Sequence, residues 1–130
     1  MTKLPISSLL VTAAISLAAI SSSYAAPPTK TGNSAKGDIL TDGKGMALYT
    51  FDKDADGKSA CNGPCATNWP VLKAEASDKP ADSYTIITRD DGSKQWAYKG
   101  KPLYTFAKDQ KPGDITGDGF FNGAWHLAKP

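Results

Sequence analysis

The sequence is poor in the residues on which many catalytic and metal sites depend. Its 130 residues include one histidine, His126, two cysteines and one glutamate, Glu75. A single histidine excludes a His/His metal cluster, and its neighbours in a presumed strand do not indicate a Ser-His-Asp arrangement. A paired-carboxylate hydrolase would depend on aspartates alone, and no Gly-rich phosphate loop or C-x-x-C-H haem motif is present. We therefore expect a protein that is not an enzyme.

An excess of charge of one sign is also lacking. The chain has 15 lysines and arginines against 13 aspartates and glutamates, a formal net charge of +2. Proteins that bind nucleic acid or anionic membranes carry a clear basic excess. The balance of charge therefore argues against both kinds of partner.

The one long apolar run lies at the N-terminus. Lys3 precedes an uncharged stretch of fifteen residues, 6–20, and the small residues Ser23 and Ala25 follow at the spacing of a cleavage site. This pattern predicts a secretory signal peptide over residues 1–25. Because a membrane span needs about 20 apolar residues, we expect no integral span in the mature protein. The mature protein is expected in the periplasm or outside the cell.

Composition divides the rest of the chain into two parts. Residues 26–36 are rich in proline, threonine, serine and lysine and show no apolar periodicity. This composition predicts a flexible linker. The glycine- and proline-rich remainder, residues 37–130, is long enough for one small domain.

The strongest internal signal in that domain is a repeat. Residues 45–54 (GMALYTFDKD) align with residues 100–109 (GKPLYTFAKD), with seven of ten positions identical. Trp69 follows the first copy at nearly the distance at which Trp125 follows the second. The pattern predicts two copies of one supersecondary unit.

Each unit has the residues of β-strands. β-branched and aromatic residues are bracketed by glycine and aspartate, which favour turns. We predict an all-β fold of about six short antiparallel strands, built from two related β-hairpin repeats. The expected strands are residues 38–41, 46–51, 84–89, 94–98, 103–106 and 124–127, with one helical turn near residues 64–69.

The alternation of a strand places Tyr49 and Phe51 on one face, and Tyr104 and Phe106 repeat this arrangement. Such paired aromatic faces form either a hydrophobic core or a ligand-binding surface. We predict a core, because a domain of this size has few other large side chains. Tyr49 and Tyr104 are then equivalent buried positions.

Cys61 and Cys65 are the only cysteines, and they lie in a chain expected to be exported. The intervening Gly63-Pro64 favours a turn, so we predict a structural disulfide. The Gly-Pro-Cys ending is similar to that of thioredoxin-type sites, although those have two intervening residues and a longer helix. A thiol-redox protein working through this pair remains an alternative.

An acidic loop follows the first copy of the repeat. Asp52, Asp54 and Asp56 precede Gly57 in the D-x-D-x-D-G order of a calcium loop, but Gly63 occupies the position of the bidentate glutamate. The loop is therefore either a solvated turn or a weak calcium site, and no other cofactor is indicated. We predict that Asp54 and its counterpart Asp109 accept hydrogen bonds from the turns that follow them, with cation binding as the alternative.

The two motif copies also carry a family resemblance. The matching residues are Tyr49, Phe51 and Asp54 with Cys61, Cys65 and Trp69, and then Tyr104, Phe106, Asp109 and Trp125. Around them the chain resembles a bacterial family of secreted or lipid-anchored proteins named for a Y-x-[F/W/Y]-x-x-D repeat. Many members are lipoproteins, whereas this chain has no cysteine near the cleavage point. The resemblance implies export and a repeat fold, and no activity, substrate or cofactor.

These observations lead to one functional hypothesis and two alternatives. The hypothesis is an exported, non-catalytic β-repeat module that binds a protein or a small ligand in the bacterial envelope. The alternatives are a calcium-binding module using Asp52, Asp54 and Asp56, and a thiol-redox protein using Cys61 and Cys65.

Overall fold

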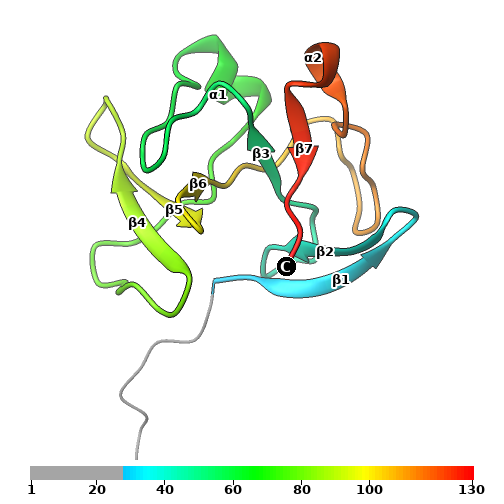
Figure 1. The fold of residues 1–130 in the computed structure, drawn as a ribbon, viewed down its shortest axis with the longest axis horizontal. Helices are drawn as coiled ribbons and strands as arrows, with labels where there is room; N and C mark the ends of the chain where they lie inside the picture. Colours follow the sequence, from blue (N-terminus) through cyan, green and yellow to red (C-terminus); the bar gives the residue numbers. More distant parts are fainter. Residues whose placement is uncertain (1–27) are drawn as a thin grey trace, which may run out of the picture.

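The computed structural model describes residues 28–130, so the predicted signal peptide over residues 1–25 lies outside the described residues. The described chain is all-β apart from two helical turns, which confirms the predicted fold class (Figure 1). None of its helices is long and apolar enough to cross a membrane. The strands are β1 (Lys30–Ser34), β2 (Gly37–Thr41), β3 (Tyr49–Phe51), β4 (Tyr84–Thr88), β5 (Lys94–Tyr98), β6 (Lys101–Pro102) and β7 (Trp125–Leu127), and the helical turns are α1 (Pro64–Asn68) and α2 (Phe120–Gly123).

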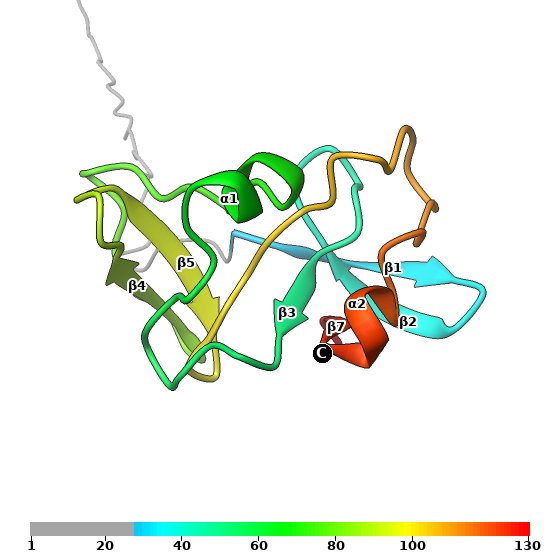
Figure 2. The same ribbon diagram turned by 90° about the horizontal axis from the view of Figure 1, so that it is seen from above.

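The strands form three small antiparallel sheets, β1-β2, β3-β7 and β4-β5-β6. Both views place the β3-β7 pair between the β1-β2 hairpin and the three-stranded sheet (Figures 1 and 2). β3 belongs to the first copy of the repeat and β7 to the second, and Phe51 pairs with Trp125 across them. The two copies therefore meet in the central sheet.

The predicted hairpin of residues 84–98 is present as β4 and β5. Its turn is closed by the Arg89 amide, which donates to the Ser93 carbonyl at 2.8 Å. The hairpin predicted between residues 38–41 and 46–51 is reduced to a bridge between Thr41 and Ala47, and its second strand shortens to β3. The strand pairing between these two segments is short, because neighbouring residues form their backbone hydrogen bonds with different segments of the chain.

The strand predicted at residues 103–106 does not form as a continuous strand, because its residues also pair with different segments. β6 covers Lys101–Pro102 instead, and Tyr104 forms separate bridges with Tyr49 and with Val71. Such contacts between distant parts of the chain are not visible in a local sequence pattern.

The flexible linker predicted for residues 26–36 is overturned at residues 30–34, which form β1. This strand pairs with β2 in a register from Lys30 opposite Thr41 to Ser34 opposite Gly37. β1 is mostly exposed, and backbone hydrogen bonds to β2 hold it in place. Because its side chains do not have to fill a core, its sequence shows no apolar periodicity, and the strand was not visible in the sequence. Gly32 also permits close pairing, since a Cβ atom there would lie 2.9 Å from the Thr41 methyl group.

The hydrophobic core has two parts, separated by the chain segments around Tyr49 and Tyr104. Leu48 and Leu103 point into one part, whereas Tyr49 and Tyr104 point into the other. The predicted alternation is thus confirmed, and the leucine and the tyrosine of each motif segment are buried on opposite faces. The tyrosine cluster holds Ile39, Ala47, Tyr49, Cys61, Trp69, Tyr104, Phe106, Trp125 and Leu127, and the leucine cluster holds Leu40, Leu48, Ala74, Tyr84, Trp96, Leu103 and Ala128.

Candidate functional site

The two copies of the motif meet at Tyr49 and Tyr104. The Tyr49 amide donates to the Tyr104 carbonyl at 2.7 Å, and the Tyr104 amide donates to the Tyr49 carbonyl at 3.0 Å. Both side chains have no exposed surface. The predicted equivalence of the two buried tyrosines is therefore confirmed, and an approximate two-fold axis passes between them.

Each tyrosine hydroxyl donates to the aspartate of the opposite motif copy. The Tyr49 hydroxyl lies 2.6 Å from Asp109 Oδ2, and the Tyr104 hydroxyl lies 2.6 Å from Asp54 Oδ2. The motif is thus completed between copies and not within one copy. Sequence reasoning missed this exchange, although a buried tyrosine hydroxyl requires an acceptor and each motif ends in one carboxylate.

The second carboxylate oxygen of each aspartate holds the following turn. Asp54 Oδ1 accepts from the Ala60 amide at 2.6 Å, and Asp109 Oδ1 accepts from the Thr116 amide at 2.9 Å and from its hydroxyl. The predicted turn role of both aspartates is confirmed. Burial raises the pKa of the Asp54 carboxyl, while the Tyr104 hydroxyl and the Ala60 amide oppose that rise.

Four aromatic rings stack across the same axis in the order Phe51, Trp125, Trp69, Phe106. The centroids of the two indoles are 3.7 Å apart with planes inclined by 2°, and each phenyl ring lies 4.1 Å from its neighbouring indole. Each phenylalanine therefore stacks on the tryptophan of the other copy. The stack ties the two copies together a second time.

Burial of the tyrosine hydroxyls predicts a loss of stability at alkaline pH. Burial, reinforced by the partner carboxylates, raises the pKa of Tyr49 and of Tyr104 well above the ordinary value of 10.0. The unfolded chain releases these protons near pH 10 and the folded chain keeps them. Their contribution is therefore complete below pH 10 and is lost as the pH rises, at about 1.4 kcal/mol per pH unit for each tyrosine.

Denaturant unfolding at a series of pH values above 10 measures this slope. Tyr49→Phe is the matched variant, because it removes one titrating hydroxyl and keeps the ring. We expect its slope to be shallower than that of the parent by about 1.4 kcal/mol per pH unit. Equal slopes would contradict the assignment.

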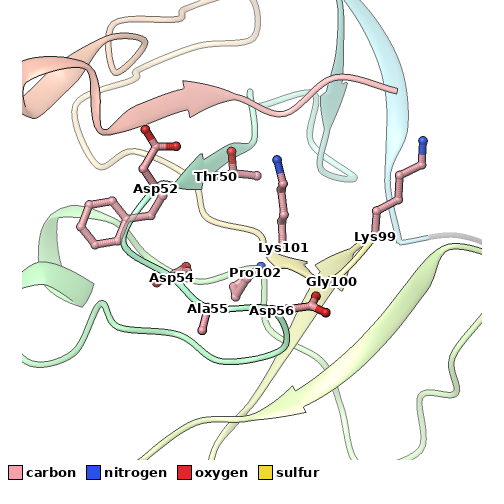
Figure 3. Close-up of a pocket in the computed structure, with 10 residues that line it drawn as sticks. Thr50, Asp52, Asp54, Ala55, Asp56, Lys99, Gly100, Lys101 and Pro102 are labelled. Carbon is pink, nitrogen blue, oxygen red and sulfur yellow. The ribbon is translucent and has the colours of Figure 1, made fainter.

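The three carboxylates of the acidic loop point in different directions (Figure 3). Asp52 Oδ2 lies 2.8 Å from Nε2 of His126 on the exposed side of β7, and Asp54 is bound as described. Asp56 packs against Gly100, where an added Cβ atom would lie 1.7 Å from Asp56 Oδ1. Within residues 28–130 no group of three or more His, Cys, Asp or Glu side chains is placed to hold a metal ion.

The predicted disulfide between Cys61 and Cys65 is confirmed, with the sulfur atoms 2.01 Å and the Cα atoms 5.2 Å apart. Cys61 is fully buried, and the guanidinium of the buried Arg89 donates to its carbonyl. Cys65 lies in α1, which begins at Pro64 and ends before Pro70, whereas Cys61 lies in the loop that precedes it. This arrangement fits a structural crosslink.

Removing the disulfide should lower the free energy of unfolding by about 2 kcal/mol, because the bond restricts the unfolded chain over a short loop. Denaturant unfolding of the parent with and without reductant, and of a Cys61→Ala/Cys65→Ala variant, measures this loss. Two reactive thiols, counted after denaturing protein isolated from the cell envelope, would show that the bond does not form there.

The most exposed large aromatic residues lie in α2, beside the ring stack. Phe120 is 44% exposed and Phe121 is 60% exposed, and Phe121 and Asn122 adopt left-handed backbone angles with φ near 59° and 58°. Such angles are strained for residues other than glycine and gather at functional positions. Sequence reasoning missed this segment, although two adjacent phenylalanines in a glycine-rich turn were a visible signal.

A cavity of about 390 Å³ opens beside these phenylalanines, and we call it the aromatic cavity. Its wall includes the outer part of the ring stack and the disulfide. Lys53 is its one charged lining residue, and Asn68 supplies an amide. The remaining lining residues are Phe51, Ala60, Cys65, Trp69, Phe120, Phe121 and Trp125.

Two segments of the chain, residues 30–73 and 85–129, each match a family described as a secreted repeat of unknown function. The chain belongs to this secreted-repeat family. Each matched segment contains one Y-x-F-x-x-D copy and the tryptophan that follows it. No significant match was found among curated proteins or among solved structures.

Family membership and the hydrogen bonds together define the folding unit. Tyr49 lies in the first secreted repeat and Asp109 in the second, while Asp54 and Tyr104 are placed the opposite way. A single secreted repeat of this chain would lose the hydrogen bonds that its tyrosine and its aspartate make with the other copy. The two repeats therefore stabilise each other.

Proposed function

We propose that this pair of secreted repeats is a non-catalytic module of the bacterial envelope, acting in the periplasm or outside the cell. It binds a small apolar ligand that carries one anionic group. The aromatic cavity is the binding site. The proposal rests on one observation. Exposed phenylalanines, a strained backbone segment and the mainly apolar wall of a cavity lie together at one place.

The structural roles of the motif side chains support a non-catalytic function. The tyrosines and aspartates of both motifs are engaged in hydrogen bonds that hold the repeats and turns together. The stacked indoles of Trp69 and Trp125 are buried. These groups hold the fold together, and the large exposed side chains beside them, Phe120 and Phe121, are apolar.

The size and lining of the aromatic cavity support a small ligand. A volume of about 390 Å³ lies within the range of sites for small molecules, which are mainly apolar with a few polar groups that fix orientation. The ammonium group of Lys53 and the amide of Asn68 are such groups. Because the one charge is positive, the ligand that fits best carries one anionic group at its end.

Two related fluorescent probes test the proposal. Anilinonaphthalene sulfonate supplies an aromatic body with one anionic group, and N-phenylnaphthylamine supplies a similar body without charge. We expect saturable binding of the anionic probe, weakened about tenfold by Phe121→Ser and by Lys53→Glu, which corresponds to about 1.4 kcal/mol. The neutral probe should respond to Phe121→Ser and not to Lys53→Glu.

The matched control is Lys79→Glu, which makes the same charge change at an exposed lysine outside the aromatic cavity. Its affinity for the anionic probe should equal that of the parent. If Phe121→Ser leaves both probes bound as tightly as before, the aromatic cavity is not the binding site. If Lys79→Glu weakens binding as much as Lys53→Glu, the charge effect is not local.

A further inference from the structure

A second pocket, of about 440 Å³, lies beside β3, β6 and β7, and we call it the lysine pocket. Thr50 and Asp52 line it, whereas Lys53 of the same segment lines the aromatic cavity. The two sets of lining residues have no member in common. The lysine pocket is therefore separate from the site of the proposed function.

Hydrogen-bond donors and positive charges dominate the lining of the lysine pocket. The donor-bearing residues are Lys99, Lys101, Lys129, Thr50, Tyr98 and His126. The one carboxylate among the lining residues belongs to Asp52, which is paired with His126 at 2.8 Å. The pocket therefore has a surplus of positive charge, although the whole chain is nearly neutral.

Two of these ammonium groups have no carboxylate partner. Across the described residues, no carboxylate lies within ion-pair distance of the Lys99 or the Lys101 side chain. The Lys99 ammonium lies 5.1 Å from the centroid of the Tyr98 ring. Both are exposed, and they extend to the same side of the chain (Figure 3). Lys99 and Lys101 both line the lysine pocket, so their charges face the same space.

The turn that presents these lysines is held in one conformation. Lys99 has a left-handed backbone with φ 51°, and its amide donates to the Ser83 carbonyl at 2.8 Å. Gly100 follows with φ 86° and packs against Asp56, which leaves no room for a side chain. Positive φ at both central residues is the geometry of a two-residue hairpin turn, and this turn joins Tyr98 of β5 to Lys101 of β6.

The acidic loop limits where an anionic ligand can extend. Asp54 and Asp56 line an adjoining cavity that shares Lys99 and Lys101 with the lysine pocket (Figure 3). Their carboxylates repel an anion on that side. Lys129 also lines the lysine pocket, and its ammonium group donates to the Lys36 carbonyl at 2.7 Å. An anionic group is therefore best accommodated between Lys99 and Lys101, away from the acidic loop.

We propose that the lysine pocket binds a phosphoryl group of the monoester class. The ammonium groups of Lys99 and Lys101 neutralise its two negative charges, and lysine is a common phosphate ligand. The hydroxyls of Thr50 and Tyr98 supply further donors to its oxygens. The group can come from free phosphate or from the head group of a lipid, because the chemistry recognised is the same.

Titration of the mature protein with inorganic phosphate, followed by amide chemical shifts, tests the proposal. We expect saturable shifts at Thr50 and Lys101, with affinity reduced about tenfold in Lys99→Gln/Lys101→Gln. Lys79→Gln is the matched control and should bind as the parent does. All of these lysines are exposed, and melting curves will verify that the variants fold. An absence of saturable shifts with phosphate and of binding to phosphatidic acid, or an equal loss in the control, would overturn the proposal.

Vesicles distinguish the two sources of the phosphoryl group. Phosphatidylcholine vesicles containing phosphatidic acid present a phosphomonoester, whereas those containing phosphatidylglycerol present a phosphodiester of lower charge. Binding to the first kind alone, lost in Lys99→Gln/Lys101→Gln, supports a lipid source. Equal binding to both kinds overturns the proposal, since it would reflect general attraction to a negative surface. Binding of the fluorescent probes should be unchanged in this variant, so the two proposals can fail separately.

Discussion

Replacing Tyr49 by alanine should lower the free energy of unfolding by about 3–5 kcal/mol, the range for large aromatic residues in a core, and replacing Tyr104 should lower it by a similar amount. Both side chains are fully buried, and each contacts an indole edge-on, with centroids 5.3 Å apart for Tyr49 and Trp69 and 5.1 Å apart for Tyr104 and Trp125. The similarity of the two losses follows from the approximate two-fold axis.

Denaturant unfolding of both variants measures these losses. Tyr49→Phe and Tyr104→Phe are the controls, because they keep the ring and remove only the hydroxyl, and each should cost less than its alanine variant. A loss below about 1 kcal/mol in either alanine variant would contradict burial of that ring.

Replacing Trp125 by alanine should also lower the free energy of unfolding by about 3–5 kcal/mol. Trp125 is 2% exposed and lies between Phe51 and Trp69 in the ring stack, so its loss removes two stacked contacts and opens a cavity. Phe121→Ala is the comparison within the aromatic cavity. Since Phe121 is 60% exposed, its replacement should cost less than about 1 kcal/mol.

The indole stack also has a spectroscopic signature. Two indoles with centroids 3.7 Å apart and nearly parallel planes should couple in circular dichroism. We expect this signal to disappear in Trp125→Phe and to survive in Trp96→Phe, because Trp96 lies in the leucine cluster and outside the stack. Survival of the signal in Trp125→Phe would contradict the stacked arrangement.

Features with a local pattern were predicted well from the sequence. Alternation placed Tyr49 and Tyr104 in the core, and turn residues between apolar runs identified the hairpin of β4 and β5. The short spacing of Cys61 and Cys65 predicted their disulfide. The hairpin and the disulfide join residues that are close in sequence. The two tyrosines were predicted because each copy of the repeat shows the same alternation.

Features that depend on pairing between the copies could not be predicted in this way. The motif suggests that Tyr49 and Asp54 act together, yet their polar groups bond to the other copy. Similarly, β1 forms through backbone bonds that leave no trace in its side chains. The alternating aspartates of the acidic loop resembled calcium ligands, but in the fold one holds a tyrosine and another holds His126.

Double-mutant cycles on the tyrosines and aspartates test the exchange between copies most directly. Tyr→Phe and Asp→Ala substitutions are combined in the crossed pairs, Tyr49 with Asp109 and Tyr104 with Asp54, and in the pairs within one motif. We expect coupling energies of about 1–3 kcal/mol in both crossed pairs and below about 0.5 kcal/mol within each motif. Strong coupling within each motif, with none across the copies, would contradict the account.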